Sequence, residues 1–175
     1  LRRQAIRPLR KPLIALTPKS LLRHKLAIST LEDLAEGTFQ NVIGEIDTLD
    51  ADKVDRVIMC SGKVYYDLLE KRRNDGIKTT ALVRIEQLYP FPEDDLTAEL
   101  AKYKNLERVV WCQEEPMNQG AWYCSQHHMR RVASACKPTL DLQYAGRVAS
   151  ASPACGYASM HAEQPEQLLH DAFNV

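Results

Sequence analysis

WCQEEPMNQGAWYCSQHH, residues 111–128, joins an apolar segment to a helical one through an acidic, amide-rich turn. The overlapping run RVVWC, residues 108–112, is short and apolar, which is typical of a strand buried on both faces of a sheet. A proline and a glycine then interrupt the chain, and Asn118 is a candidate cap for a helix over 119–133. The strand is therefore expected to deliver polar side chains to the C-terminal edge of a sheet: Gln113, Glu114 and Glu115.

Other apolar runs of strand length occur along the chain, at residues 13–16, 57–60, 79–85 and about 140–144. Segments with helical character lie between and after them, at residues 29–35, 62–74, 93–104 and 163–173. Strands that alternate with helices favour a parallel sheet covered on both faces. The sequence therefore predicts a three-layer α/β domain, with a mostly parallel sheet of roughly five strands and helices on both faces.

The composition indicates an ordinary globular protein. The chain has 175 residues, 45% of them apolar, which is enough to bury a sizeable core. Basic and acidic residues balance at 23 each, so no overall field favours nucleic acid or a membrane surface, and neither is expected as a partner. No apolar run approaches the roughly 18 residues of a membrane-spanning helix. The five cysteines lack CxxC spacing, so reduced thiols are expected rather than a zinc site.

The first eleven residues, LRRQAIRPLRK, carry four arginines and one lysine and could be mistaken for a transit peptide. Against that interpretation, they lack an initiating methionine and continue directly into the apolar run at 13–16. We expect residues 1–11 to be a linker from a longer protein. Residues 12–175 are then predicted to form a single α/β domain.

Adjacent carboxylates at a sheet edge, Glu114 and Glu115, could act as an acid and base pair. Consecutive residues of an extended segment point to opposite sides, however, so the two carboxylates cannot readily share one substrate atom. An interface or hydrogen-bonding role is favoured for them.

Two further patterns invite functional interpretations that their spacing does not support. Residues 61–63, Ser-Gly-Lys, follow an apolar run as in an anion-binding loop, but the full phosphate-loop spacing is absent. His127 and His128 are neighbours, and in a helix their side chains would point about 100° apart, which disfavours a shared metal ion. No catalytic, cofactor-binding or metal-ligating residue is therefore expected in this chain.

Five ordered motifs carry a resemblance to a known family. They are TPKSLLRH (17–24), CSGKVYYDLLE (60–70), VRIEQLYPFP (83–92), WCQEEPMNQGAW (111–122) and YAGRVASASPACGYASMHAEQ (144–164). Together they resemble the C-terminal domain of the E1 component of 2-oxoglutarate dehydrogenase, a member of the transketolase-like superfamily. The resemblance implies a fold like the transketolase C-terminal domain.

The resemblance also implies a parent enzyme. Such a parent decarboxylates 2-oxoglutarate in the tricarboxylic acid cycle on thiamine diphosphate and Mg, which are bound by its other domains. It passes the succinyl group to the lipoyl arm of E2, dihydrolipoyl succinyltransferase, in a complex that includes E3. The resemblance implies an E1 homodimer, in the cytoplasm of a bacterium or the mitochondrial matrix of a eukaryote. The fragment alone is expected to be inactive.

Within that family, the resemblance suggests two roles for this domain. In the first, it stabilises the assembly and shapes the entrance used by lipoamide, with the interface residues Glu114, Glu115, Asn118 and Gln119. In the alternative, it binds an allosteric nucleotide, AMP or acetyl-coenzyme A, with the residues Thr17, Arg23, Arg84 and Gln87. Asp94 and Asp95 stand where some members of the family carry a basic pair, and their carboxylates would repel acetyl-coenzyme A.

Overall fold

The computed structural model describes residue 4 and residues 7–175, and the chain divides into two compact units, residues 1–40 and 41–175. The division differs from the boundary predicted after Lys11, and the treatment of residues 12–175 as one domain stays a prediction. The first unit contains the 3-10 helix η1 (Lys19–Arg23) and the helix α2 (Leu31–Ala35). None of its described residues is buried.

The strand predicted at residues 13–16 is wrong. These residues form no regular structure, and Ile14 and Leu16 are 86% and 96% exposed. An apolar run becomes a strand only where a neighbouring strand pairs its backbone groups, and none pairs here. The short helix predicted over 29–35 is confirmed as α2, and Thr30 caps it: its side chain accepts from the Asp33 backbone N–H while the Asp33 carboxylate binds the Thr30 N–H.

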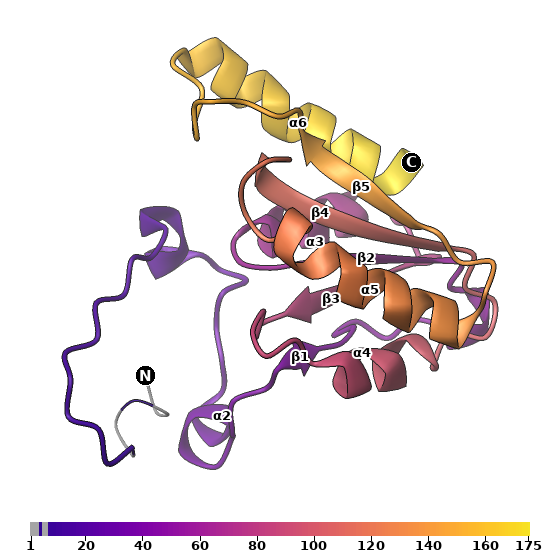
Figure 1. Ribbon diagram of the computed structural model, residues 1–175, viewed down its shortest axis with the longest axis horizontal. Helices are drawn as coiled ribbons and strands as arrows, with labels where there is room; N and C mark the ends of the chain where they lie inside the picture. The colour runs from indigo at the N-terminus through magenta and orange to yellow at the C-terminus, as the bar shows by residue number, and fades with distance from the viewer. Residues whose placement is uncertain (1–3, 5–6) are drawn as a thin grey trace. The chain divides into compact units, whose positions relative to one another are not determined.

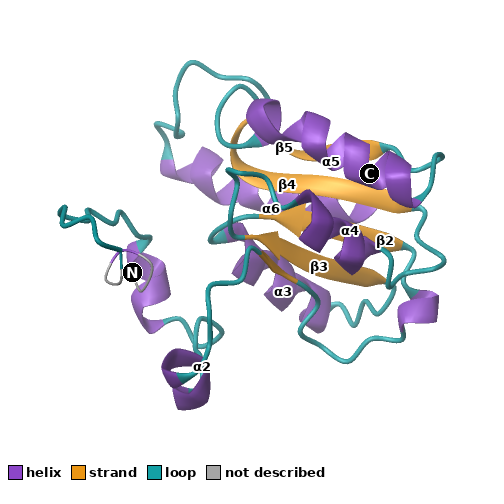
Figure 2. Cartoon of the chain, turned by 60° about the horizontal axis from the view of Figure 1, so that its bottom comes forward, coloured by secondary structure: helices purple, strands orange, loops and turns teal. Residues whose placement is uncertain are grey.

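The second unit is a three-layer α/β domain (Figures 1 and 2). Its strands are β1 (Val42–Ile43), β2 (Arg56–Cys60), β3 (Thr80–Ile85), β4 (Arg108–Pro116) and β5 (Leu142–Arg147). Its helices are η2 (Ala51–Lys53), α3 (Val64–Asn74), α4 (Glu93–Leu100), α5 (Trp122–Cys136) and α6 (Ala158–Asn174). The side chains of residues 158–162 lie outside the described part.

The five-stranded sheet has the order β1-β3-β2-β4-β5, and only β1 is antiparallel to its neighbour. Helices α4 and α5 pack side by side on one face, and α3 and α6 on the other. The fold class predicted from the sequence is therefore confirmed. The fifth strand is β1, which replaces the run at 13–16.

The inner strands are apolar because both of their faces are covered. Every residue of β2 is buried, with Val57 and Met59 in the cluster that includes Leu96 of α4 and Met129 of α5. Val64, Leu68 and Leu69 of α3 are buried as well, as expected for the apolar stripe of a helix that packs on a sheet.

A buried ionic network ties the segment before η2 to α3 and β3. The Arg72 guanidinium, with a 1% exposed side chain, binds both carboxylate oxygens of Glu45 and also Asp47 Oδ2 at 2.6 Å. It donates to the Thr80 carbonyl at 3.2 Å, and Glu45 accepts from the Leu82 N–H at 2.8 Å. Burial lowers the pKa of Arg72, but its hydrogen bonds to Glu45 and Asp47 and the charges of these carboxylates together outweigh burial and raise that pKa.

The strand order creates a topological switch point between β2 and β4. The chain leaves β2 through α3 toward β3, on one side, and leaves β4 through α5 toward β5, on the other. The register aligns Cys60, the last residue of β2, with Cys112 of β4. Because β4 continues to Pro116, Gln113 to Glu115 belong to the strand rather than to the turn that was predicted after residue 112. Crevices at such points are where open α/β sheets bind ligands.

Candidate functional site

The turn between β4 and α5 is organised by one buried amide, that of Gln113, which is 3% exposed. Its Oε1 accepts from the indole Nε1 of Trp111 at 2.9 Å and from the backbone N–H of Trp122 at 3.0 Å. Its Nε2 donates to the carbonyls of Gln119 at 2.8 Å and Pro116 at 3.1 Å. One side chain therefore holds the end of the strand, the turn and the first residue of the helix.

The cap predicted for this helix is wrong. The helix begins at Trp122, and the cap position is Ala121, whose side chain offers no acceptor. Asn118 instead binds the backbone of Ser150, accepting its N–H at 2.9 Å and donating to its carbonyl at 3.0 Å. The acceptor for the first backbone N–H of α5, that of Trp122, comes from Gln113 of the strand, because the bulged end of β4 brings that amide to the helix.

Glu114 and Glu115 are exposed at the C-terminal edge of β4. The Glu114 carboxylate pairs with Lys63 Nζ at 3.4 Å, and that ammonium also binds Asp67 at 2.5 Å. Burial lowers the pKa of Lys63, but the hydrogen bond to Asp67 and the charge of Glu114 outweigh burial and raise that pKa. The contact spans the switch point, because Lys63 follows β2 and Glu114 belongs to β4.

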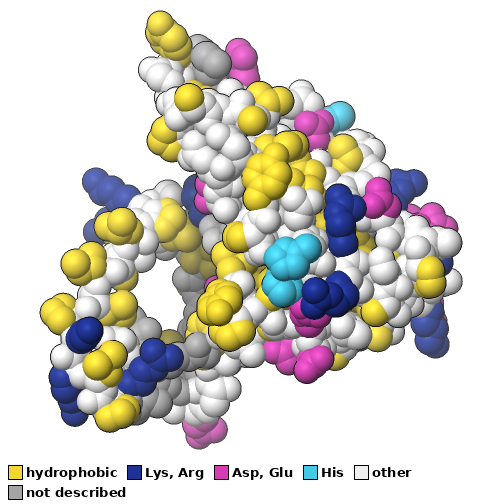
Figure 3. Space-filling model, viewed as in Figure 1, with side chains coloured by type: hydrophobic (Ala, Val, Ile, Leu, Met, Phe, Trp, Pro, Cys, Tyr) yellow, Lys and Arg dark blue, Asp and Glu magenta, His cyan; other side chains and the backbone are white. Residues whose placement is uncertain are grey.

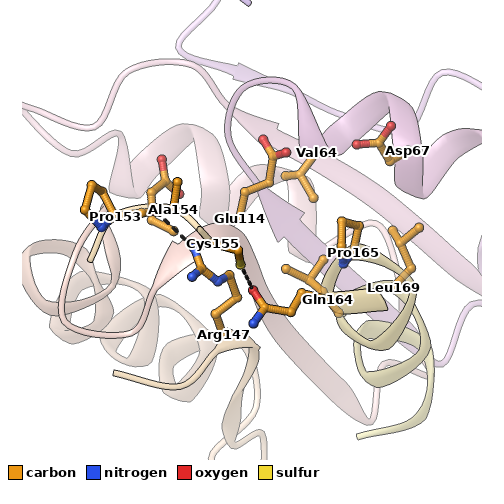
Figure 4. A pocket seen from close by; sticks show the side chains of 12 residues that line it. Val64, Asp67, Glu114, Arg147, Pro153, Ala154, Cys155, Gln164, Pro165 and Leu169 are labelled. Carbon is orange, nitrogen blue, oxygen red and sulfur yellow. Dashed lines mark hydrogen bonds between the residues drawn. The ribbon is translucent and has the colours of Figure 1, made fainter. Parts of the chain in front are cut away.

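A cavity of about 250 Å³ lies beside these carboxylates (Figure 4). It is lined by α3, β4, the end of β5, the following loop and α6: Val64, Asp67, Glu114, Glu115, Arg147, Pro153, Ala154, Cys155, Gln164, Pro165, Leu168 and Leu169. Both Glu114 and Glu115 line it, although they were expected to point to opposite sides. A β-bulge between Gln113 and Pro116 interrupts the regular alternation of side chains there.

The structure thus divides the predicted interface residues into two pairs. Glu114 and Glu115 line the cavity, whereas Asn118 and Gln119 both bind the Ser150 carbonyl and hold the loop after β5. The cavity's basic residue, Arg147, was missed in the sequence. Its position at the end of the last parallel strand is the signal that could have identified it.

The residues predicted for a nucleotide lie in different units of the chain. Thr17 and Arg23 belong to residues 1–40, and Arg84 and Gln87 to residues 41–175. Arg84 is the next-to-last residue of β3, and its guanidinium lies over the Tyr65 ring, 4.3 Å from the ring centroid. Gln87 Nε2 donates to the Pro90 carbonyl at 2.9 Å. The nucleotide set stays a prediction.

Figure 3 shows histidine side chains gathered over α5, the helix that carries His127 and His128, whose ring centroids are 3.9 Å apart. The His128 ring stacks on Phe91, with centroids 5.1 Å apart, and its Nδ1 contacts the Glu93 carboxylate. Among the residues that the structure describes, no three His, Cys, Asp or Glu side chains are grouped to hold a metal ion. In the same part of the chain, no helix combines the length and apolar character needed to cross a membrane.

Comparison with known proteins gives a consistent answer. The sequence model of the family described as 2-oxoglutarate dehydrogenase C-terminal matches residues 28–173. The chain is 74% identical over its whole length to the 2-oxoglutarate dehydrogenase E1 component of Azotobacter vinelandii. It is 59% identical over 99% of its length to the E1 component of Haemophilus influenzae. It spans only 19% and 18% of those two relatives.

A solved structure titled "Split gene transketolase, inactive beta4 tetramer" is also similar, with a TM-score of 0.47 and 18% sequence identity. The match covers 68% of this chain and 37% of that one.

Proposed function

The chain belongs to the 2-oxoglutarate dehydrogenase E1 family, as its C-terminal domain, and from this we propose that it serves as an assembly domain of the parent enzyme. The parent decarboxylates 2-oxoglutarate in the tricarboxylic acid cycle and transfers the succinyl group to the lipoyl group of E2, dihydrolipoyl succinyltransferase, with E3 in the same complex. It acts as a homodimer, and the bacterial relatives support a cytoplasmic location.

Thiamine diphosphate and Mg supply the decarboxylation chemistry of the parent. Among the described residues, no three His, Cys, Asp or Glu side chains are grouped to hold its magnesium ion. We propose that the remainder of the parent binds the cofactor, as the family resemblance implies. The role of this chain is binding and positioning.

The observation that carries the proposal is the exposed acidic edge at the switch point. Glu114 and Glu115 stand at the end of β4 on a segment that the buried Gln113 amide fixes in place. A fixed, charged edge is suited to contact another domain or an incoming carrier. We propose that this edge, with Asn118 and Gln119 supporting it, contacts the lipoyl-bearing partner or borders its path to the cofactor.

The test uses the full-length E1 enzyme with Glu114→Ala and Glu115→Ala combined. We expect the overall rate of the assembled complex to fall, while decarboxylation with an artificial electron acceptor, which bypasses the lipoyl group, stays near the wild-type rate. Glu107→Gln, an exposed carboxylate at the opposite end of the sheet, is the matched control. If the double variant keeps both the complex activity and the dimerisation of the wild type, the proposal is wrong.

The nucleotide-binding alternative makes a different prediction. The buried Nε of Arg84 has no hydrogen-bond partner among the described residues, but the Glu86 carboxylate lies 3.8 Å from it, so a phosphate oxygen would have to displace that carboxylate. Calorimetry with AMP would then give a saturable heat that is lost in Arg84→Ala and Gln87→Ala. The same measurement with Arg23→Ala and Thr17→Ala tests whether the first unit takes part. No heat with the wild-type chain would exclude this role.

A further inference from the structure

A second cavity, of about 390 Å³, lies at the opposite edge of the sheet from the switch point. This helix-end cavity is formed where α4 and α5 end and where the chain continues toward β4 and β5. Its volume is at the lower end of the range typical of ligand pockets, which suits a small ligand. It is lined by Thr97, Leu100, Ala101, Tyr103, Lys104, Leu106, Ala135, Cys136, Lys137 and Leu140.

The inner wall of the helix-end cavity is apolar. Leu100, Leu106 and Leu140 are buried members of the core cluster and also line the cavity. They come from the end of α4, the loop before β4 and the loop before β5, and the sheet sets the positions of these segments. The cavity therefore offers a preformed surface on which a hydrocarbon group can be removed from water.

The rim of the cavity is cationic. Lys104 and Lys137 line it, and its described lining residues include no carboxylate. The Lys137 ammonium donates to the Leu106 carbonyl at 3.2 Å, which holds it beside the apolar wall, and it pairs with no carboxylate among the residues that the structure describes. Lys104 lies 3.9 Å from Asp52, but both side chains are largely exposed, and such a contact contributes little in water. An incoming anion therefore finds both positive charges available.

The charge balance of the cavity selects a single negative charge. The two lysines contribute two positive charges, and the C-terminal ends of α4 and α5 each contribute about half a negative charge, so the surplus is about one positive charge. A monoanion neutralises this surplus. A dianion leaves an excess of negative charge, and a cation is repelled.

The Cys136 thiol does not make the cavity reactive. Its Sγ lies 4.0 Å from the Thr97 carbonyl, and burial raises the pKa of the thiol. Because the thiolate is the nucleophilic form of cysteine, this side chain is unreactive near neutral pH. Reversible binding is therefore the chemistry that these residues support.

We infer that the helix-end cavity binds a small aliphatic monocarboxylate. The carboxylate of this ligand pairs with Lys137 and Lys104 at the rim, and its hydrocarbon chain packs on the three leucines of the inner wall. The inference goes beyond the function proposed above, because the cavity shares no residue with the acidic edge and neither depends on the other.

The experiment is an NMR titration of the 175-residue chain, labelled with ¹³C and ¹⁵N, with octanoate. We expect saturable shifts in the backbone amides of Ala101, Leu106 and Leu140. We also expect nuclear Overhauser contacts from the octanoate methyl group to the leucine methyl groups of the inner wall. The amide of Glu114, at the other edge of the sheet, should not move.

Three probes with the same chain length test the chemistry of the ligand. Octan-1-ol has the chain without the charge, octylamine reverses the charge, and octanedioate places a second carboxylate against the apolar wall. Each should bind about tenfold or more weakly than octanoate. The reason is that each probe either loses hydrogen bonds between charged groups or buries a charge without a partner.

Variants test the assigned contacts. Lys137→Met removes the ammonium held beside the wall and should weaken octanoate binding about tenfold or more, whereas Lys137→Arg keeps the charge and should restore binding to near the wild-type level. Lys104→Met should weaken binding less, because the Lys104 side chain is 80% exposed. Lys78→Met removes an exposed lysine from the loop before β3 and is the matched control, which should bind as the wild type does.

The inference is wrong if octanoate gives no saturable shifts, or if the shifts map outside the helix-end cavity. It is equally wrong if octan-1-ol binds as tightly as octanoate, or if Lys137→Met, with an unchanged melting curve, binds as the wild type does. Should Lys137→Met fail to fold, the comparison of octanoate with octan-1-ol on the wild-type chain decides the question. None of these results bears on the proposed function, which depends on the complex assay of the Glu114 and Glu115 variant.

Discussion

Replacing Gln113 by leucine should destabilise the turn that presents the acidic edge. Leucine keeps the approximate volume but removes the acceptor of two buried donors, the Trp111 indole N–H and the Trp122 backbone N–H. It also leaves the carbonyls of Pro116 and Gln119 without their donor. Each buried donor without a partner costs about 1–3 kcal/mol, whereas the turn carbonyls can regain water. We expect a loss of about 3 kcal/mol in the free energy of unfolding.

Urea unfolding followed by tryptophan fluorescence measures this loss directly. The chain has two tryptophans, and both donate a hydrogen bond to the Gln113 amide, so their emission reports on the turn as well as on global unfolding. Gln143→Leu is the matched control, because the Gln143 Oε1 is buried without a hydrogen-bond partner among the described residues. It should be close to neutral. A Gln113→Leu stability within about 0.5 kcal/mol of wild type would refute the role given to this amide.

Gln113→Glu separates the acceptor from the donor role of the same side chain. An ionised carboxylate can still accept from both tryptophans, but it cannot donate to the two carbonyls, which would repel it. Its folded-state pKa should therefore be raised above the unfolded value of about 4.3. Stability of this variant should be greatest below that unfolded pKa and should be lost as pH rises through the folded pKa. If the difference in unfolding free energy between Gln113→Glu and the wild type is the same at pH 4 and pH 8, this assignment is contradicted.

Glu45→Ala leaves the buried Arg72 guanidinium without its bidentate partner and should cost about 3–5 kcal/mol by urea unfolding, part of which Arg72→Met in the same chain should restore. The hydrogen bond from Arg73, with Arg72 contributing, lowers the pKa of Asp47 in the folded protein. The ionised Asp47 carboxylate therefore stabilises the fold above its unfolded-state pKa, and this contribution is lost as pH falls through its folded-state pKa. In thermal melts between pH 5 and pH 2, Asp47→Asn should lose less stability with falling pH than the wild type does. Gly62→Ala and Gly120→Ala both place alanine at a positive φ, 77° and 65°, at a cost of about 1–2 kcal/mol. Only at Gly120 would the new methyl group lie 3.0 Å from a buried amide nitrogen, so its melting temperature should fall further than that of Gly62→Ala.

The inner strands were predictable because burial on both faces leaves a strong apolar signal. The runs at 57–60 and 79–85 match β2 and β3 within one residue at each end. The run at 13–16 carries the same local signal without a pairing partner, and β1, only Val42 and Ile43, is too short to be recognised. Local apolar patterning therefore identified the inner strands and the edge strand β5, but it failed at the β1 edge of the sheet, where pairing decides.

The site was predictable in location but not in connectivity. The order of strands and helices placed Glu114 and Glu115 at the C-terminal edge, and the structure puts them there. The turn, however, contains several amides and carboxylates that could cap a helix, and sequence position favoured Asn118. The partner of each amide depends on the bulge in β4 and on the loop after β5, which are set by long-range pairing. No local pattern encodes that choice.

The cavity and the acidic edge have a single structural origin, which is the unequal length of the two strands at the switch point. β2 ends at Cys60, in register with Cys112, whereas β4 continues for four residues and remains paired only with β5, where Gln113 aligns with Gly146 and Pro116 with Arg147. On the side that β2 has vacated, Lys63 approaches Glu114 across the gap. The extended strand supplies Glu114 and Glu115, and its one remaining neighbour supplies Arg147, so three of the charged residues that line the cavity lie past the end of β2. Gln113 is the first residue of β4 past the end of β2. Shortening β4 at this point would therefore remove together the carboxylates, one wall of the cavity and the acceptor for the first N–H of α5.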